Sequence, residues 1–376
     1  MTEHESDRIT LDTVELSGTP EEMGESFGEE TRNETRELYE RRLIAALEYM
    51  REHHEHRGTT RDVLAAAEAC LPVTEAFDPE GYREFRAIAR GAALSPAQLF
   101  VTQGLTDLRD MLAFAAPTAE SEGCSSFVHL PPSDSNGKLL AGQNWDLMDD
   151  NMPFVRLVHR KPDSAPETLS VTLTGCLSLI GMNSEGVCVG NTNLQSRDIR
   201  RSGVQYLSII HRALRCSTAD EAIEVISSAP RAAAHYYYTA DRHGTAWGIE
   251  CSANDEDRVR ITDGTCVHCN HFLSQRLKAL EVPITDESTG FRQERLSALL
   301  NDAGTSCDRL TASRARTALS DTEGGELAIC RYNVGPYDIS TNASVIMCPE
   351  TGELHACRGQ PDRGRWITRR LPVAPV

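Results

Sequence analysis

The chain has 376 residues, of which 40% are hydrophobic, so it is long enough to bury a large core in one big domain or in two. Its formal net charge of −18 argues against nucleic acid or an anionic membrane as the main partner. The sequence has no apolar run of about 18 residues, the length that a membrane-spanning helix needs. Its polar start, MTEHESDRIT, lacks the features of a secretory signal. We therefore expect a cytoplasmic protein with no membrane partner.

The first 115 or so residues are predicted to be mainly helical. Residues 9–17 alternate as a strand does, and a long helix is expected over residues 20–56. Further helices are expected over 60–77 and 79–90. Another begins after Ser95, where a serine cap precedes a proline in the first turn of SPAQLFVTQGLTDL.

From Cys124 onward the chain follows a different pattern, in which a polar turn containing glycine separates two apolar strands. The pattern occurs four times, with turns in PPSDSNG, NSEG, DRHG and PETG, and such turns are typical of β-hairpins. Residues 204–215 have helical spacing, and TADE is a capping-box signature at the start of 218–228. Two more helices are expected over 272–300 and 308–320. This order predicts a single α+β domain in which helices cover two antiparallel sheets.

The twelve cysteines do not suggest a disulfide framework. Several lie inside apolar runs, such as Cys188 in GVCVG and Cys348 in VIMCP. In a long chain without a secretory signal, such thiols are expected to be reduced, buried and inert.

Cys124, in SEGCSSF, stands apart because a glycine precedes it directly at the start of an apolar strand. A thiol inside a chain has a pKa near 8.5 and needs a base to become a good nucleophile. If the Gly123–Cys124 bond is cut, Cys124 gains an α-amine with a reference pKa of about 7.7–8.0, which can serve as that base. Gly123 would suit such a junction, since glycine tolerates strained backbone conformations. Cys124 is therefore a candidate for a new N-terminus.

The sequence resembles the acyl-coenzyme A:6-aminopenicillanate (isopenicillin N) acyltransferase family of N-terminal-nucleophile (Ntn) hydrolases. The similarity begins in ELSGTPEEMGESFG and EFRAIARGAALSPAQLF and continues through SEGCSSF, GKLLAGQNWDL and GMNSEGVCVGNTNL. It extends to VHCNHFL, LAICRYN and ASVIMCPETGEL, so it covers nearly the whole chain. The resemblance implies an αββα sandwich that is made as a precursor and cuts itself before the cysteine. The pieces would be a helical portion, residues 1–123, and a catalytic portion, residues 124–376, within one integrated domain.

The resemblance also implies roles for residues beyond Cys124, the nucleophile. Asp146 would orient the new α-amine, and the backbone N–H of Trp145 or Asp146 would donate to the oxyanion. The side-chain amide of Asn270, in CNHF, would complete the oxyanion hole, where one donor is typically worth on the order of 10²–10³ in rate. Arg331, in ICRYN, would lower the thiol pKa or hold an anionic intermediate. Ser252, in IECS, matches to within one position a family serine needed for self-cleavage.

Two positions depart from relatives within this resemblance. Bile-salt and penicillin V hydrolases tend to carry arginine where this chain has Gln143, and Cys330 lies where the penicillin enzyme has serine. Neither is the nucleophile, so both bear on which acyl group is bound rather than on the type of reaction.

Alternatives for the cysteines remain open. CVHCNH offers Cys266, His268, Cys269 and His271 with C-x-x-C spacing, as in zinc sites, but no second such pair occurs and strand alternation points these residues to opposite faces. HHEH at 53–56 lies in a polar helical stretch and fits a solvated face better than a ligand set. The context of a papain-like Cys–His pair is missing around Cys124.

The leading hypothesis is thus a self-cleaving amide hydrolase or acyltransferase that acts on a linear N-acyl amide through a Cys124 thioester. It needs no cofactor and no metal. Its partners would be a small acyl amide, with acyl-coenzyme A as a candidate donor, and the two pieces of its own precursor. The alternative is an unprocessed, non-catalytic or metal-binding protein of the same fold.

Overall fold

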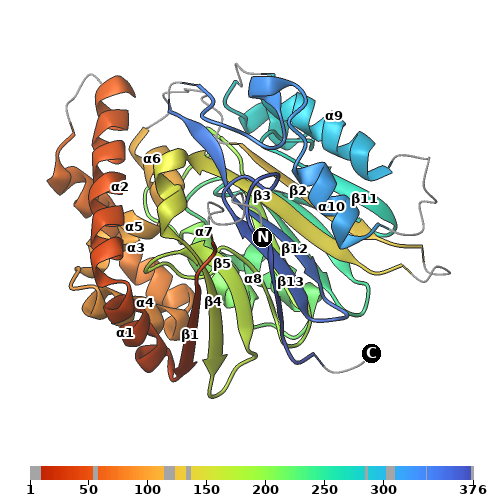
Figure 1. Ribbon diagram of the computed structural model, residues 1–376. Coiled ribbons are helices and arrows are strands. Elements are labelled where there is room, and N and C mark those ends of the chain that lie inside the picture. Colours follow the sequence, from red (N-terminus) through yellow and green to blue (C-terminus); the bar gives the residue numbers. More distant parts are fainter. Residues whose placement is uncertain are drawn as a thin grey trace, which may run out of the picture.

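The computed structural model describes residues 10–53, 58–113, 123–132, 137–283, 287–301, 310–335 and 337–373. Two β-sheets lie against each other at its centre, with β7 of the first in contact with β2 and β3 of the second (Figure 1). Helix α8 packs on strands β7 to β9 of the first sheet, while α9 and α10 pack on the second. The predicted α+β fold with two sheets between helical layers is confirmed.

Eight strands form the first sheet in the order β1-β4-β5-β6-β7-β8-β9-β10, and six form the second in the order β11-β2-β3-β12-β13-β14. The strands are β1 Thr13–Gly18, β2 Cys124–Leu130, β3 Leu140–Met148, β4 Val155–Pro162, β5 Thr168–Leu173, β6 Ile180–Asn183, β7 Val187–Asn193, β8 His235–Asp241, β9 Ala246–Cys251, β10 Glu256–Ile261, β11 Gly264–His268, β12 Ile339–Cys348, β13 Glu353–Arg358 and β14 Ile367–Arg370.

The helices of the N-terminal part are α1 Pro20–Glu30, α2 Arg32–His53, α3 Thr60–Phe77, α4 Pro79–Gly91, α5 Pro96–Gln103 and α6 Leu105–Ala113. Those of the later part are α7 Tyr206–Ala213, α8 Ala219–Ser228, α9 Ser288–Asn301 and α10 Ala312–Leu319. Short 3₁₀ helices span Asp149–Phe154, Leu277–Leu280 and Gly325–Leu327.

All four predicted hairpins form, as the antiparallel pairs β2–β3, β6–β7, β8–β9 and β12–β13. The two predicted antiparallel sheets are present, and one pair of strands at an edge is parallel. Strand β1 pairs with β4 in parallel, with Thr13 opposite Leu157. The N-terminal part therefore contributes an edge strand to the first sheet, which a local sequence pattern cannot reveal because the two strands are far apart in the chain.

The single helix expected over residues 20–56 is divided at Thr31. Thr31 ends α1 and its hydroxyl donates to the carbonyl of Phe27 at 2.7 Å. Helix α1 packs closely on α4, since a Cβ on Gly24 would overlap the carbonyl of Glu84. Of the HHEH stretch, residues 54–56 lie outside the described ranges.

The helix expected over 272–300 was wrong in its first half, where α9 begins only at Ser288. The N–H of Leu273 donates to Glu250 Oε1 at 2.6 Å, and that of Ser274 donates to Glu250 Oε2 at 2.9 Å. A carboxylate from a distant strand thus takes up the backbone donors of this stretch. Pro283 follows in the same stretch and lacks a backbone N–H of its own.

Buried ion pairs join the N-terminal helices to the later part of the chain. Glu84 of α4 accepts from Arg160 Nε of β4 at 2.7 Å, and its other oxygen lies 3.2 Å from His211 Nε2 of α7. Asp78, the N-cap of α4, pairs with Arg215. In the part of the chain that the structure describes, no helix is both long and apolar enough to cross a membrane.

Candidate active site

Cys124 is the first residue of β2 and is buried, with 5% of its surface exposed. It lies opposite Trp145 in the register of β2 and β3. Its backbone N–H donates to Oδ1 of Asn270, which follows β11, at 2.8 Å. The nitrogen that self-cleavage would turn into an α-amine is therefore held by a side chain from a distant segment.

Asp146 follows Trp145 on β3 and is fully buried. Its Oδ1 accepts a hydrogen bond from the hydroxyl of Thr341 at 2.7 Å, and its Oδ2 has no hydrogen-bond partner among the described residues. Burial raises the pKa of Asp146 to about 6, although the charges of Arg331 and Arg292 and the Thr341 hydrogen bond oppose the rise. A buried carboxylate with an unused oxygen suits a cationic or hydrogen-bonding group that comes close to it.

Arg331 is buried in the segment before β12, and Thr341 ties it to Asp146. The backbone N–H of Arg331 donates to the Thr341 hydroxyl at 3.0 Å, and the Thr341 N–H donates to the Arg331 carbonyl at 3.1 Å. One threonine thus positions both the carboxylate and the arginine, and no sequence motif had pointed to Thr341.

Gly123 lies between these charged groups. A Cβ at Gly123 would overlap Nη1 of Arg331 and would lie 3.1 Å from Oδ2 of Asp146. The expectation of a strained backbone at Gly123 stays a prediction. What the site requires at position 123 is space, since any larger residue would displace the Arg331 guanidinium.

Asn270 holds its place through three further contacts. Its backbone N–H donates to the Thr289 hydroxyl at 2.8 Å, and its Nδ2 donates to the carbonyl of Asn193 at 2.9 Å. Its Oδ1 accepts from Arg292 Nη2 at 3.0 Å in addition to Cys124. Two donors on Oδ1 fix the orientation of the amide, and one N–H of Nδ2 remains for an oxyanion.

Arg292 is the site residue that sequence reasoning missed most clearly. It lies on α9, four residues before Leu296 and eight before Leu300, which are both buried. This spacing placed the arginine on the apolar face of the helix, a signal readable in the sequence. Its Nη1 donates to the carbonyl of Cys124.

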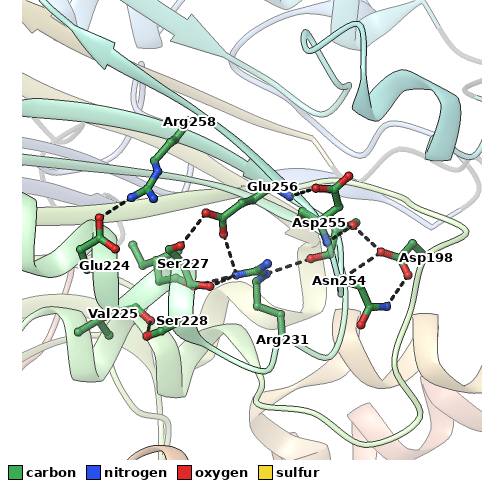
Figure 2. Close-up of polar contacts among 12 residues, drawn as sticks. Asp198, Glu224, Val225, Ser227, Ser228, Arg231, Asn254, Asp255, Glu256 and Arg258 are labelled. Carbon is green, nitrogen blue, oxygen red and sulfur yellow. Dashed lines mark hydrogen bonds and ion pairs between the residues drawn. The ribbon is translucent and has the colours of Figure 1, made fainter.

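Ser252, which was predicted to take part in self-cleavage, has its hydrogen-bond partners away from Cys124. The hydroxyl of Ser252 donates to Asp198 Oδ2 at 2.5 Å, and its carbonyl accepts from Arg231 Nε at 2.9 Å. Figure 2 shows this neighbourhood, in which Asp198, Asn254 and Arg231 form a network of polar contacts. None of the hydrogen bonds of Ser252 reaches Cys124, Asp146 or Asn270, and its part in self-cleavage stays a prediction.

The side chain of Gln143 hydrogen-bonds to the backbone of the opposite sheet. Its Nε2 donates to the carbonyl of Asn191 at 2.8 Å, and its Oε1 accepts from the Asn191 N–H at 3.1 Å. The glutamine thus acts as a peptide group beside β7 and ties the two sheets together. The thiol of Cys330 donates to Asp362 Oδ1 at 3.5 Å, and burial raises its pKa.

The C-x-x-C segment has other partners. His268 Nε2 lies 2.7 Å from Glu250 Oε1, and Nδ1 of His271 lies 2.8 Å from the Thr289 hydroxyl. Cys266 lies beside the Tyr236 hydroxyl. Within the described ranges, no group of three or more His, Cys, Asp or Glu residues is arranged to hold a metal ion.

Known proteins are similar to this chain in sequence. The model of the family described as acyl-coenzyme A:6-aminopenicillanic acid acyl-transferase matches residues 133–363. A relative from Emericella nidulans, the acyl-coenzyme A:6-aminopenicillanic-acid-acyltransferase 40 kDa form, is 25% identical over 266 residues, or 69% of each chain. The family match places the chain among the acyl-transferases. The chain belongs to the acyl-coenzyme A:6-aminopenicillanic acid acyl-transferase family, whose model matches more than half of it.

Two solved structures are more distant. A mutant of conjugated bile acid hydrolase from Clostridium perfringens is 12% identical, with a TM-score of 0.43, and the match covers 67% of this chain and 98% of that one. Penicillin V acylase from Agrobacterium tumefaciens is also 12% identical, with a TM-score of 0.41, and the match covers 62% and 83% of the two chains.

Proposed function

We propose that the chain cuts its own Gly123–Cys124 bond and then cleaves or transfers the acyl group of a linear N-acyl amide through a Cys124 thioester. One observation carries the proposal. Cys124 opens β2 with its nitrogen on Asn270 Oδ1, and the glycine before it lies against Arg331 and Asp146. A nucleophile, an anion-stabilising amide, a cation and a carboxylate thus converge on one peptide bond.

The first step rearranges that bond. The Cys124 sulfur attacks the Gly123 carbonyl, the C–N bond breaks, and the nitrogen takes a proton to become an amine. Water then attacks the resulting thioester, which releases the Gly123 carboxylate and the Cys124 thiol. Asp146, whose Oδ2 lies beside Gly123, would accept a hydrogen bond from the new amine or pair with its protonated form.

Turnover repeats the chemistry on a substrate. The α-amine of Cys124 takes the proton of the thiol, and the thiolate attacks the acyl carbonyl. The free N–H of Asn270 and a strand N–H at Trp145 or Asp146 stabilise the oxyanion, and the ammonium returns its proton to the departing amine. Water completes hydrolysis of the thioester, whereas a second amine or thiol completes acyl transfer.

The test combines intact mass, N-terminal sequencing and turnover of a substrate panel made of two kinds of N-acyl amide, N-acyl amino acids and penicillins, and of the thioester acyl-coenzyme A. We expect a new chain that begins with CSSFV, and we expect Cys124→Ala to stay whole and inactive. A whole wild-type chain that turned over acyl amides would refute self-cleavage, and a cleaved chain with no activity on any amide would refute the enzymatic part.

A further inference from the structure

Arg292 lies on α9, which packs on the second sheet beside the nucleophile Cys124. The side chain is completely buried, with 0% of its surface exposed. Its guanidinium contacts four acceptors around the start of β2. They are the carbonyl of Cys124, the hydroxyl of Ser125 at 3.1 Å, Oδ1 of Asn270 at 3.0 Å and the hydroxyl of Ser288 at 3.0 Å. The planar fork of arginine can hold such a set at once, which an ammonium group cannot.

All four acceptors are neutral. Arg292 has no carboxylate within salt-bridge distance among the described residues, whereas the buried Arg160 has Glu84 and the buried Arg231 has Glu256 (Figure 2). Burying a cation without a carboxylate in direct contact is costly, so the position of Arg292 beside a nucleophile needs an explanation.

We propose that Arg292 is a positioning residue for Cys124, which fixes the Cys124 carbonyl and the Asn270 amide so that the Cys124 nitrogen stays on Asn270 Oδ1 before and after cleavage. This inference rests on the proposed function. The guanidinium binds the carbonyl of Cys124 and also binds Oδ1 of Asn270. That oxygen accepts the hydrogen bond from the backbone nitrogen of Cys124. Without Arg292, the amide of Asn270 would lose one of the two donors that orient it.

The charge of Arg292 adds a second effect on the α-amine. The titratable and charged groups around the Gly123–Cys124 junction are Arg292 from α9, Asp146 from β3, Arg331 before β12 and Tyr238 from β8, with Cys269 beside Arg292 and Ser125. Asp146 favours the protonated amine, while the two arginines favour the neutral amine and the thiolate. Removing the charge of Arg292 should therefore raise the amine pKa and shift the acid side of the pH–rate profile to higher pH.

Two variants separate position from charge. Arg292→Gln removes the charge and the fork, and Arg292→Lys keeps the charge but loses the fork. We expect both to release the CSSFV chain more slowly and to turn over more slowly once processed. The kcat of Arg292→Gln should fall about 100-fold with KM little changed, the cost of a misplaced reacting group. Its pH profile should shift upward, whereas that of Arg292→Lys should stay.

Arg231→Gln and Arg231→Lys are the matched controls. Arg231 is also a buried arginine that binds backbone carbonyls, but it lies in the network of Figure 2. These variants should lose thermal stability while the kcat and pH profile of processed enzyme stay unchanged. If the Arg292 variants behaved in the same way, the proposal would be overturned. A wild-type chain that was neither cleaved nor active would instead refute the proposed function itself.

Should the Arg292 variants fail to fold, Ser125→Ala tests the same contact from the other side. This variant removes the Ser125 hydroxyl, which accepts from Nη1 of Arg292. The same Nη1 also donates to the Cys124 carbonyl. We expect a kcat lower by about tenfold, the effect of one such hydrogen bond, at an unchanged melting temperature. An unchanged kcat beside unfolded Arg292 variants would assign Arg292 to stability alone and overturn the proposal.

Discussion

The backbone nitrogen of Cys124 lies 2.8 Å from Oδ1 of Asn270, although 146 positions separate the two residues. The contact joins the first residue of β2 to the segment that follows β11, its neighbour in the sheet. Because Nδ2 of Asn270 is held by the carbonyl of Asn193, the same amide also connects the two sheets. The position of the reacting nitrogen therefore depends on how the sheets pack.

Asn270→Ala removes this contact and a proposed oxyanion donor. We expect kcat of an N-acyl amide to fall by about 10²–10³, the usual effect of losing one such donor. Asn183→Ala is a matched control, because Asn183 is another buried asparagine, whose Nδ2 donates to the carbonyls of Leu214 and Cys216. The control should lose about 1–3 kcal/mol of stability and keep its kcat. Wild-type turnover by Asn270→Ala would remove Asn270 from the mechanism.

Gly123→Ala should slow self-cleavage but not later turnover. The added Cβ would overlap the Arg331 guanidinium in the precursor, whereas after cleavage residue 123 is no longer bonded to the nucleophile. The measurement is the rate at which a chain beginning with Cys124 appears in mass spectra, followed by kcat of the processed fraction. Gly290→Ala is the control, since a Cβ at Gly290 meets nothing within 4 Å. Equal cleavage rates for the two variants would contradict the role given to Gly123.

Asp146 should make the uncleaved chain less stable as the pH rises. Its folded-state pKa, about 6, lies above the ordinary value of 3.8, so the stability contribution is fully present below about pH 4 and is lost as the pH rises through 6. The whole effect amounts to about 3 kcal/mol. Urea unfolding of Cys124→Ala between pH 4 and 7 should show this loss, and Cys124→Ala combined with Asp146→Asn should lack it. Parallel curves for the two proteins would show that Asp146 keeps an ordinary pKa.

The two pieces should stay together after cleavage, because β1 pairs with β4 and Glu84 is buried against Arg160. Glu84→Gln leaves the Arg160 charge without its partner, so we expect a loss of about 3–5 kcal/mol in the free energy of unfolding. Glu37→Gln breaks only an exposed pair with Arg41 and should cost about 1 kcal/mol or less. Gel filtration of cleaved enzyme checks the first point and urea unfolding the second. Separate elution of the two pieces would contradict the expectation that they stay together after cleavage.

Local patterns in the sequence were enough for much of the fold. The four hairpins followed from glycine-containing turns between apolar runs, and the start of α5 followed from Ser95, which accepts from the Gln98 N–H at 3.2 Å while Gln98 caps it in return. These signals involve hydrogen bonds between residues a few positions apart, so they are readable in a single sequence. The order of motifs likewise pointed to the Gly123–Cys124 junction.

The arrangement of the site could not be read in this way. Asp146, Asn270, Arg331 and Arg292 come together around Cys124 only because β2 lies between β3 and β11 and α9 packs over them. The same dependence on distant segments explains two of the departures from the expected fold, since the stretch after Phe272 binds Glu250 instead of forming a helix and β1 pairs with a distant strand. The sequence by itself determined the turns, the caps and the identity of a cysteine behind a glycine. The tertiary structure decided which buried polar groups face that cysteine, because a buried group must be satisfied by whatever partner the packing of the sheets brings to it.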